Sequence, residues 1–327
     1  MKLNYNLIIV LSLMCLSSCY QDVELNHIVN PSLVINAAVS ADTIVMASIS
    51  QTVPFTDSRD VHPILDDAEV GLYVNDEFVN NMIWHKNETS AGGIYCSSYY
   101  PQNEDVIRIV VKHDSRQAWA EDTVPEKCFI NKLDVTFDIF DDNNSVIYDG
   151  EHLMPGKKYV FTYRVTFHDN PNKKNFYCIR IDNGLGNVND IGILDYSSDP
   201  VFVAQSQALN GINMEKSISG QGGRTFSDDM FQGQSYTMII KEEESISFYD
   251  YRSNLPRRIM LYSLSNSYYK YLTGLLNDES GNSVTESLMS FGFKEPIRHF
   301  SNVVSGTGIL GCFQMDTYVL DLNMVRK

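Results

Sequence analysis

Alternation of apolar and polar residues constrains the fold of this chain more than any other feature. In the clearest run, residues 158–168, the apolar side chains recur at every second position: Tyr159, Phe161, Tyr163, Val165 and Phe167. A period of two is typical of a β-strand with one buried face. Comparable runs predict strands at 33–39, 43–52, 68–74, 78–84, 105–112, 117–124, 133–140, 175–181, 236–241, 259–264 and 312–322. The sequence therefore predicts an all-β protein.

The spacing of these runs divides the chain into two parts at Pro125. About seven short strands with turn residues every 8–12 positions predict an N-terminal Ig-like antiparallel β-sandwich over residues 32–125. Residues 126–327 predict a larger β-rich domain with long loops and one short helix near 266–277. In that helix the apolar residues follow a spacing of three and four: Tyr268, Tyr271, Leu272 and Leu275.

The N-terminus has the pattern of an export signal. Lys2 precedes the apolar segment Leu7–Leu16, and small residues follow. A helix needs about 20 apolar residues to span a bilayer, so this segment is too short to be a membrane anchor. We therefore interpret residues 1–18 as a signal peptide.

The end of the signal, Leu16-Ser17-Ser18-Cys19, resembles the lipobox of bacterial lipoproteins. The resemblance implies that cleavage falls before Cys19, that its thiol carries a lipid, and that residues 19–31 form a lipidated tether. The alternative is an ordinary secretory signal with an incidental cysteine.

Charge and cysteine content limit the partners and the compartment. The formal net charge of −16 argues against nucleic acid as a partner. Export permits disulfides, but sequence cannot choose among the three pairings of four cysteines, and free thiols are the simpler expectation. These four cysteines are Cys96, Cys128, Cys178 and Cys312.

No motif in the sequence carries a catalytic or cofactor-binding assignment. Residues 306–311 match G-x-G-x-x-G, but they precede a predicted strand instead of a helix, so we expect the glycines to serve the fold. The acidic segment Asp138–Asn144 predicts a solvated turn better than a calcium loop. The run Glu242-Glu243-Glu244 is interpreted as solvated, and the seven histidines show no zinc spacing. We expect no enzyme activity, no cofactor and no metal.

Short pieces along the chain resemble a known family. In order they are Leu33–Ala37, Ser48–Phe55, Asp67–Val70, Gly93–Tyr95, Asp122–Pro125, Glu295–Ile297 and Ser301–Val303, followed by the glycine cluster. This order is similar to that of Bacteroidetes-type envelope lipoproteins of domain of unknown function family 4249 (DUF4249). The resemblance implies an outer-membrane lipoprotein beside a TonB-dependent nutrient receptor, on a periplasmic or surface face that it leaves undecided. It supplies no catalytic residues.

Three classes of function remain open from the sequence. The first is a ligand-binding or accessory lipoprotein of nutrient uptake, which the anchor and the β scaffold with tyrosine-rich loops favour. The second is a structural surface protein, such as an adhesin or pilus-like subunit. The third is an envelope hydrolase, although no hydrolase motif was found in the sequence.

Overall fold

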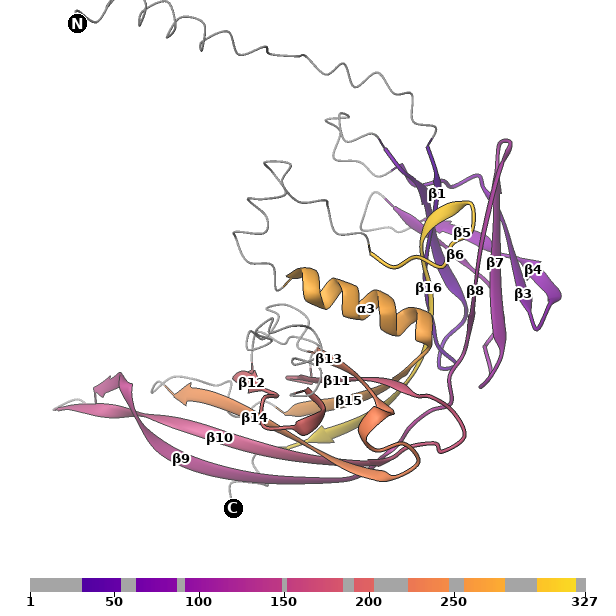
Figure 1. The fold of residues 1–327 in the computed structure, drawn as a ribbon. Coiled ribbons are helices and arrows are strands. Elements are labelled where there is room, and N and C mark those ends of the chain that lie inside the picture. The colour runs from indigo at the N-terminus through magenta and orange to yellow at the C-terminus, as the bar shows by residue number, and fades with distance from the viewer. Residues whose placement is uncertain are drawn as a thin grey trace, which may run out of the picture. The chain divides into compact units, whose positions relative to one another are not determined.

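The computed structural model describes residues 31–53, 63–86, 92–148, 152–184, 191–202, 223–246, 256–279 and 299–321. Residues 1–30, with the predicted signal peptide and Cys19, lie outside the described residues, as does nearly all of the predicted tether. Ser32–Lys327 form one compact unit. Its described residues are mainly β-strand, as the alternation predicts, with an α-helix near the middle of Figure 1.

An eight-stranded sheet joins the two halves of this unit. Its spatial order is β13 (Gly223–Ser227), β11 (Phe176–Asp182), β15 (Arg257–Leu264), β16 (Gly306–Leu320), β1 (Leu33–Val39), β2 (Met46–Gln51), β6 (Gly93–Cys96) and β5 (Ile83–Lys86).

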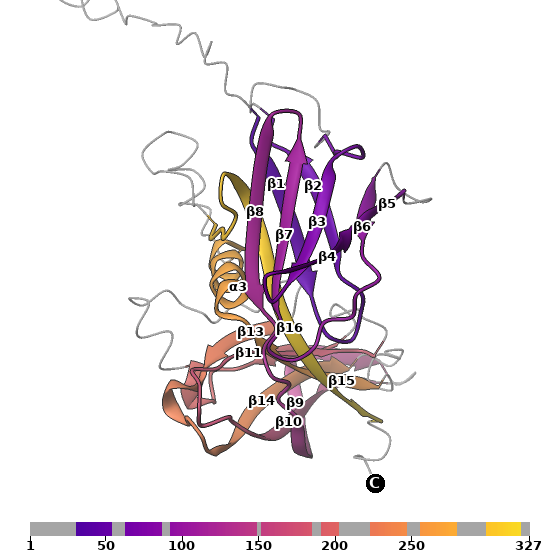
Figure 2. The ribbon, with the colours of Figure 1, turned by 90° about the vertical axis from the view of Figure 1, so that its right-hand side faces the viewer.

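Strand β16 lies in the middle of this sheet and belongs to both halves. Residues 306–312 pair with β1 in parallel, and residues 313–320 pair with β15 antiparallel. Figure 2 shows β16 running beside β1 and continuing to β15. The last described strand of the chain therefore joins its first strand to its second half.

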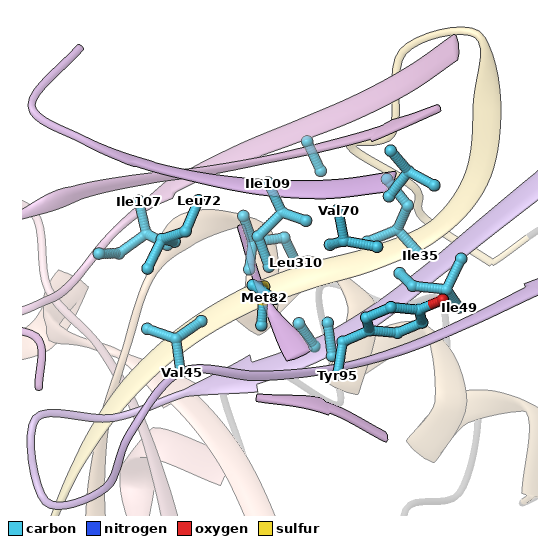
Figure 3. Close-up of a cluster of buried hydrophobic side chains, with 14 of the residues drawn as sticks. Ile35, Val45, Ile49, Val70, Leu72, Met82, Tyr95, Ile107, Ile109 and Leu310 are labelled. Carbon is cyan, nitrogen blue, oxygen red and sulfur yellow. The ribbon is translucent and has the colours of Figure 1, made fainter. Parts of the chain in front are cut away.

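The first hydrophobic core lies between the β1 end of this sheet and a second sheet. That sheet has the order β4 (Glu77–Asn81), β3 (Glu69–Val74), β7 (Val106–His113) and β8 (Arg116–Thr123). Side chains of both sheets form one buried cluster, in which Ile35, Leu72 and Ile109 have no exposed surface (Figure 3). Leu310 of β16 belongs to this cluster. Burial of one such side chain stabilises the folded state by about 1.5–3 kcal/mol. Because Ile35 and Leu310 belong to the same cluster, the stability of the first core depends on residues from both ends of the chain.

The second core lies between the β15 end of the large sheet and a third sheet. The third sheet has the order β12 (Ile193–Asp195), β14 (Ser235–Ile246), β10 (Leu153–His168) and β9 (Ile130–Tyr148). Phe161, Tyr163, Val165 and Phe167 of β10 have no exposed surface, which confirms the face predicted from their alternation. The Phe167 ring is surrounded by four aromatic rings with centroids 5.6–6.0 Å away, one of them Phe231 beside the short 3-10 helix η1 (Asp228–Met230).

Helix α3 (Asn266–Glu279) contacts β11, β13 and β16 of the large sheet (Figure 1). The helix confirms the prediction near 266–277. Ser265 caps it, because its hydroxyl accepts a hydrogen bond of 3.1 Å from the Tyr268 backbone N–H.

Three features of the fold differ from the sequence expectation. The pairing of β1 with β16 is parallel, whereas we expected an antiparallel sandwich; a parallel pair requires a long connection, which strands at opposite ends of the chain supply. The division at Pro125 assigned residues 306–312 to the second part, and the structure places them beside β1. The solvated turn expected at Asp138–Asn144 is instead part of β9, whose pairing with β10 has a register shift at Pro155/Gly156. The Ig-like arrangement of the first half stays a prediction.

The four cysteines that export could have oxidised are free thiols. Cys128 and Cys312 are buried, and Cys96 and Cys178 are partly buried. The structure therefore assigns no disulfide to any of the three possible pairings.

The glycine cluster serves the close approach of neighbouring elements to β16. Gly308 has a φ of +107°, and a Cβ atom there would lie 2.1 Å from the carbonyl oxygen of Ile35 on β1. At Gly311 a Cβ would lie 2.3 Å from the ring of Tyr268 on α3. Residues 312–320 continue as strand, so the strand–turn–helix geometry that a dinucleotide needs does not occur at this cluster.

Replacing Gly308 should destabilise the fold, whereas replacing a glycine of α3 should not. Gly308→Ala forces a side chain into the left-handed region, which costs about 1–3 kcal/mol before the contact with β1 is counted. Gly274→Ala is the matched control: the nearest atom to its added Cβ is 4.0 Å away, and alanine favours a helix over glycine by about 1 kcal/mol. Urea unfolding of both variants measures the difference. Equal stability of Gly308→Ala and wild type would contradict the account of this cluster.

Candidate functional site

A cavity of about 120 Å³ lies between α3 and the large sheet. Eight of the described residues, from five elements, line it: Cys178 and Arg180 of β11, Gly223 of β13, Tyr262 and Leu264 of β15, Phe313 of β16, and Tyr268 and Leu272 of α3. Cavities of about 150 Å³ accommodate a benzene ring, so this one has the size of a small organic molecule.

The alternation of the strands explains which side chains reach the cavity. In β11, Tyr177, Ile179 and Ile181 point into the second core, so Cys178 and Arg180 point to the side that α3 covers. Gly223 keeps this side open, because a Cβ there would lie 3.2 Å from the Cys178 Sγ atom.

Three contacts hold α3 over the cavity. The rings of Phe176 and Tyr269 stack with centroids 4.6 Å apart. The hydroxyls of Thr225 and Thr273 are 3.1 Å apart and share a hydrogen bond. Tyr268 packs against Phe313 with centroids 5.9 Å apart. The helix is thus attached to β11, β13 and β16 around the cavity.

Arg180 gives the cavity its charge. Its Nε atom is buried, and no group among the described residues accepts a hydrogen bond from it. Asp182, two residues along β11, is already engaged by Arg258, whose Nη2 and Nε donate to its carboxylate at 2.6 and 3.1 Å. A buried donor without an acceptor costs about 1–3 kcal/mol. The Arg180 guanidinium is therefore able to gain from an anionic acceptor.

The other polar groups of the lining are neutral at physiological pH. Burial raises the pKa of the Cys178 thiol and of the Tyr268 hydroxyl to about 12 each, and it raises the pKa of Tyr262 as well. A protonated thiol is a poor nucleophile, so Cys178 lines the cavity and does not act as a reactive group. Among these eight described residues, Arg180 is the one with a formal charge.

A carboxyl group from the first half fixes the start of α3. Asp122 of β8 accepts a hydrogen bond from the Ser265 hydroxyl, and another of 2.8 Å from the Cys312 backbone N–H. Burial raises the pKa of Asp122 to about 6, although these hydrogen bonds oppose the shift. The first turn of the helix over the cavity is therefore tied to both β8 and β16.

A second charged cluster is buried in the second core. Arg257 and Glu242 have no exposed surface, and the Arg257 Nη2 donates to Glu242 at 2.7 Å. Tyr163 and the Gly192 backbone N–H donate to the same carboxylate. Desolvation raises the pKa of the Tyr163 hydroxyl well above its usual value. These protein donors occupy both oxygens of the Glu242 carboxylate, so Arg257 and Glu242 form a structural ion pair. Removing either partner would leave a buried, uncompensated charge and would strongly destabilise the fold.

This cluster corrects the interpretation of Glu242-Glu243-Glu244 as a solvated run. Glu242 and Glu244 are 0% and 4% exposed, and only Glu243 points outward, where it pairs with Lys158. The signal was present in the sequence, because Met238, Ile240, Glu242 and Glu244 share one side of a strand.

The remaining sequence candidates are dispersed or lie outside the described residues. Cys19 lies outside them, as do His27 and His62. In the part of the chain that the structure describes, no three His, Cys, Asp or Glu side chains are grouped closely enough to hold a metal ion. Arg180 was missed, because an arginine in an alternating strand predicts an exposed side chain until the helix above it is placed.

Fold and cavity together define an all-β protein with two cores, one shared strand and a helix-covered cavity. The chain belongs to the family described as "Domain of unknown function (DUF4249)", whose family model matches residues 21–318. Comparison with curated proteins and with solved structures found no match. Among the described residues, no helix has the length and apolarity to cross a membrane.

The raised pKa of Asp122 predicts a dependence of stability on pH. A carboxyl whose pKa is about 6 in the folded state and about 3.9 when unfolded stabilises the fold below pH 4 and loses this contribution as pH rises to 6. We expect the wild type to lose about 1–3 kcal/mol relative to Asp122→Asn between pH 4 and pH 7. Asp138→Asn, at an exposed position of β9, is the control and should follow the wild type. Urea unfolding at both pH values tests this, and parallel curves for wild type and Asp122→Asn would contradict it.

Proposed function

We propose that this protein is a lipid-anchored outer-membrane protein that binds a small ligand, or assists its transfer, in nutrient uptake beside a TonB-dependent receptor. The anchor is Cys19, and the bound side is periplasmic or at the cell surface. The proposal includes no nucleic acid partner, because a net charge of −16 repels phosphate backbones.

The cavity under α3 carries the binding part of this proposal. Small-molecule sites are concave and mostly apolar, with a few polar groups that fix orientation. Leu264, Leu272 and Phe313 supply the apolar wall, and Arg180 supplies the polar group. Most of the lining residues lie on strands of the large sheet, which packs against both cores. A rigid support of this kind suits ligand binding with little rearrangement.

The anchor part of the proposal rests on the N-terminal sequence. Residues 1–18 have the pattern of a signal peptide and Leu16-Ser17-Ser18-Cys19 that of a lipobox. One lipid chain binds a membrane only marginally, whereas several chains anchor a protein stably. The match of the family model begins at residue 21, two residues after Cys19.

A structural surface protein is the second candidate, and β9 favours it. This 19-residue strand lies at the edge of its sheet and exposes Ile139 and Phe140, each to 53%. Val146, further along the same strand, is 64% exposed. Long apolar edge strands are templates for pairing with another chain.

Fractionation and affinity purification test the proposal together. We expect the wild-type chain to take up a labelled fatty acid, to sediment with outer membranes, and to co-purify with a TonB-dependent receptor after mild solubilisation. Cys19→Ala should take up no label and should leave the membrane fraction or retain its signal. Cys96→Ala, which changes a cysteine far from the lipobox, should behave as the wild type.

Two results would overturn the proposal. Absence of label from a membrane-bound wild type would remove the anchor. Purification of the chain as a ladder of its own oligomers, without a receptor, would favour the structural candidate.

A further inference from the structure

The charge distribution in the cavity under α3 limits the class of ligand that it can bind. Arg180 lies on the same side of β11 as Cys178, and on β15 the facing pairs are Met260 with Arg180 and Tyr262 with Cys178. The Tyr262 hydroxyl donates to the Met260 Sδ atom at 3.5 Å, so it already has an acceptor beside the cavity. Arg180 is thus the one charged donor among the described lining residues, and its Nε lacks an acceptor within the described chain.

We propose that this cavity binds a small organic monocarboxylate, with its carboxylate on Arg180 and its apolar body between Leu264, Leu272, Tyr268 and Phe313. This inference rests on the ligand-binding function proposed above and names the class of its ligand. The planar guanidinium presents parallel N–H groups that match the two oxygens of a carboxylate.

The charges around Arg180 support an anion at this place. Two arginines and one aspartate lie on neighbouring positions of β11 and β15, and Arg258 is already paired with Asp182 at 2.6 Å. Among the described residues, the Nε of Arg180 therefore remains without a hydrogen-bond acceptor. The net charge of −16 acts over longer range, and charges more than about 8–10 Å apart are largely screened at physiological ionic strength.

The size and lining of the cavity support a compact apolar body. A volume of about 120 Å³ is close to that which holds a single aromatic ring. Tyr268 and Tyr262 both pack against Phe313, with ring centroids 5.9 and 5.8 Å from the phenylalanine ring. A ring or branched alkyl group therefore meets aromatic faces and leucine side chains, whereas a second charge on the ligand would meet no partner among them.

Matched probes and variants test the inference on the chain carrying Cys19→Ala, which keeps every residue of the compact unit. Benzoate should raise the melting temperature saturably and should bind in calorimetry. Benzamide has the same shape without the charge, and benzamidine carries the opposite charge; both should bind at least tenfold more weakly. A hydrogen bond to a charged group contributes about 1.5–3 kcal/mol, which corresponds to a factor of more than ten.

Variants test separately the charge of Arg180 and the free volume of the cavity. Arg180→Gln should weaken benzoate binding at least tenfold, whereas Arg180→Lys should keep part of it. Gly223→Val fills the space beside Cys178 and should abolish binding with Arg180 intact. Arg164→Gln is the control for loss of a positive charge, because Arg164 lies on β10 and bonds to Thr136 of β9. Circular dichroism verifies that each variant is folded, and a Gly223→Val chain that does not fold is replaced by Gly223→Ala.

The outcomes distinguish failure of the carboxylate assignment from failure of the proposed function on which it rests. Equal binding of benzamide and benzoate, or benzoate binding that survives Arg180→Gln, would overturn the carboxylate assignment and leave a ligand-binding cavity. Absence of binding by all three probes in a folded protein would overturn the assignment too, while co-purification with a receptor would keep the accessory function. Absence of both would remove the inference and the proposed function together.

Discussion

The backbone pairing of β16 with both β1 and β15 is the interaction on which the rest of the structure depends. Its first seven residues, Gly306–Cys312, complete the sheet of the first half, and its last eight, Phe313–Leu320, complete that of the second. Each core therefore contains or borders residues of the last described strand of the chain. A Cβ atom at Gly308 would meet the backbone of β1, and one at Gly311 would meet the ring of Tyr268, so the glycine cluster follows from the close approach of β1 and α3 to this single strand.

The position of the cavity follows from the same strand. Tyr268 rests on the backbone of β16 at Gly311, and Asp122 of the first half ties the cap of α3 to Cys312. The start of the helix is thus fixed by residues outside the half in which it lies. Further along, α3 spans the large sheet above β11, and the space left between them is bordered by Arg180. A buried polar donor without an acceptor is costly to a fold, and its persistence beside a cavity is typical of a binding site.

Local patterns predicted the local structure and failed where distant segments meet. The alternation of Tyr159–Phe167 gave β10 and its buried face, and the spacing of Tyr268 to Leu275 gave α3, because each pattern records one element and one buried side. The parallel pair β1–β16 has no local signal, since its strands are separated by nearly the whole chain. Glu242 and Glu244 follow the alternation of β14, but their charge argued for solvent, and only the placement of Arg257 explains their burial. Arg180 was equally invisible, because its environment is set by a helix about 90 residues further along.

The central claim is that β16 makes the two halves one cooperative unit, and urea unfolding tests it directly. The sequence has two tryptophans, Trp84 and Trp119, and both lie in the first half, so tryptophan fluorescence follows that half alone. Far-ultraviolet circular dichroism follows the strands of both halves. The account predicts that the two signals change in one transition with the same midpoint. Separate midpoints, or a folded fragment ending near Pro125 after limited proteolysis, would show that the halves fold independently and would contradict it.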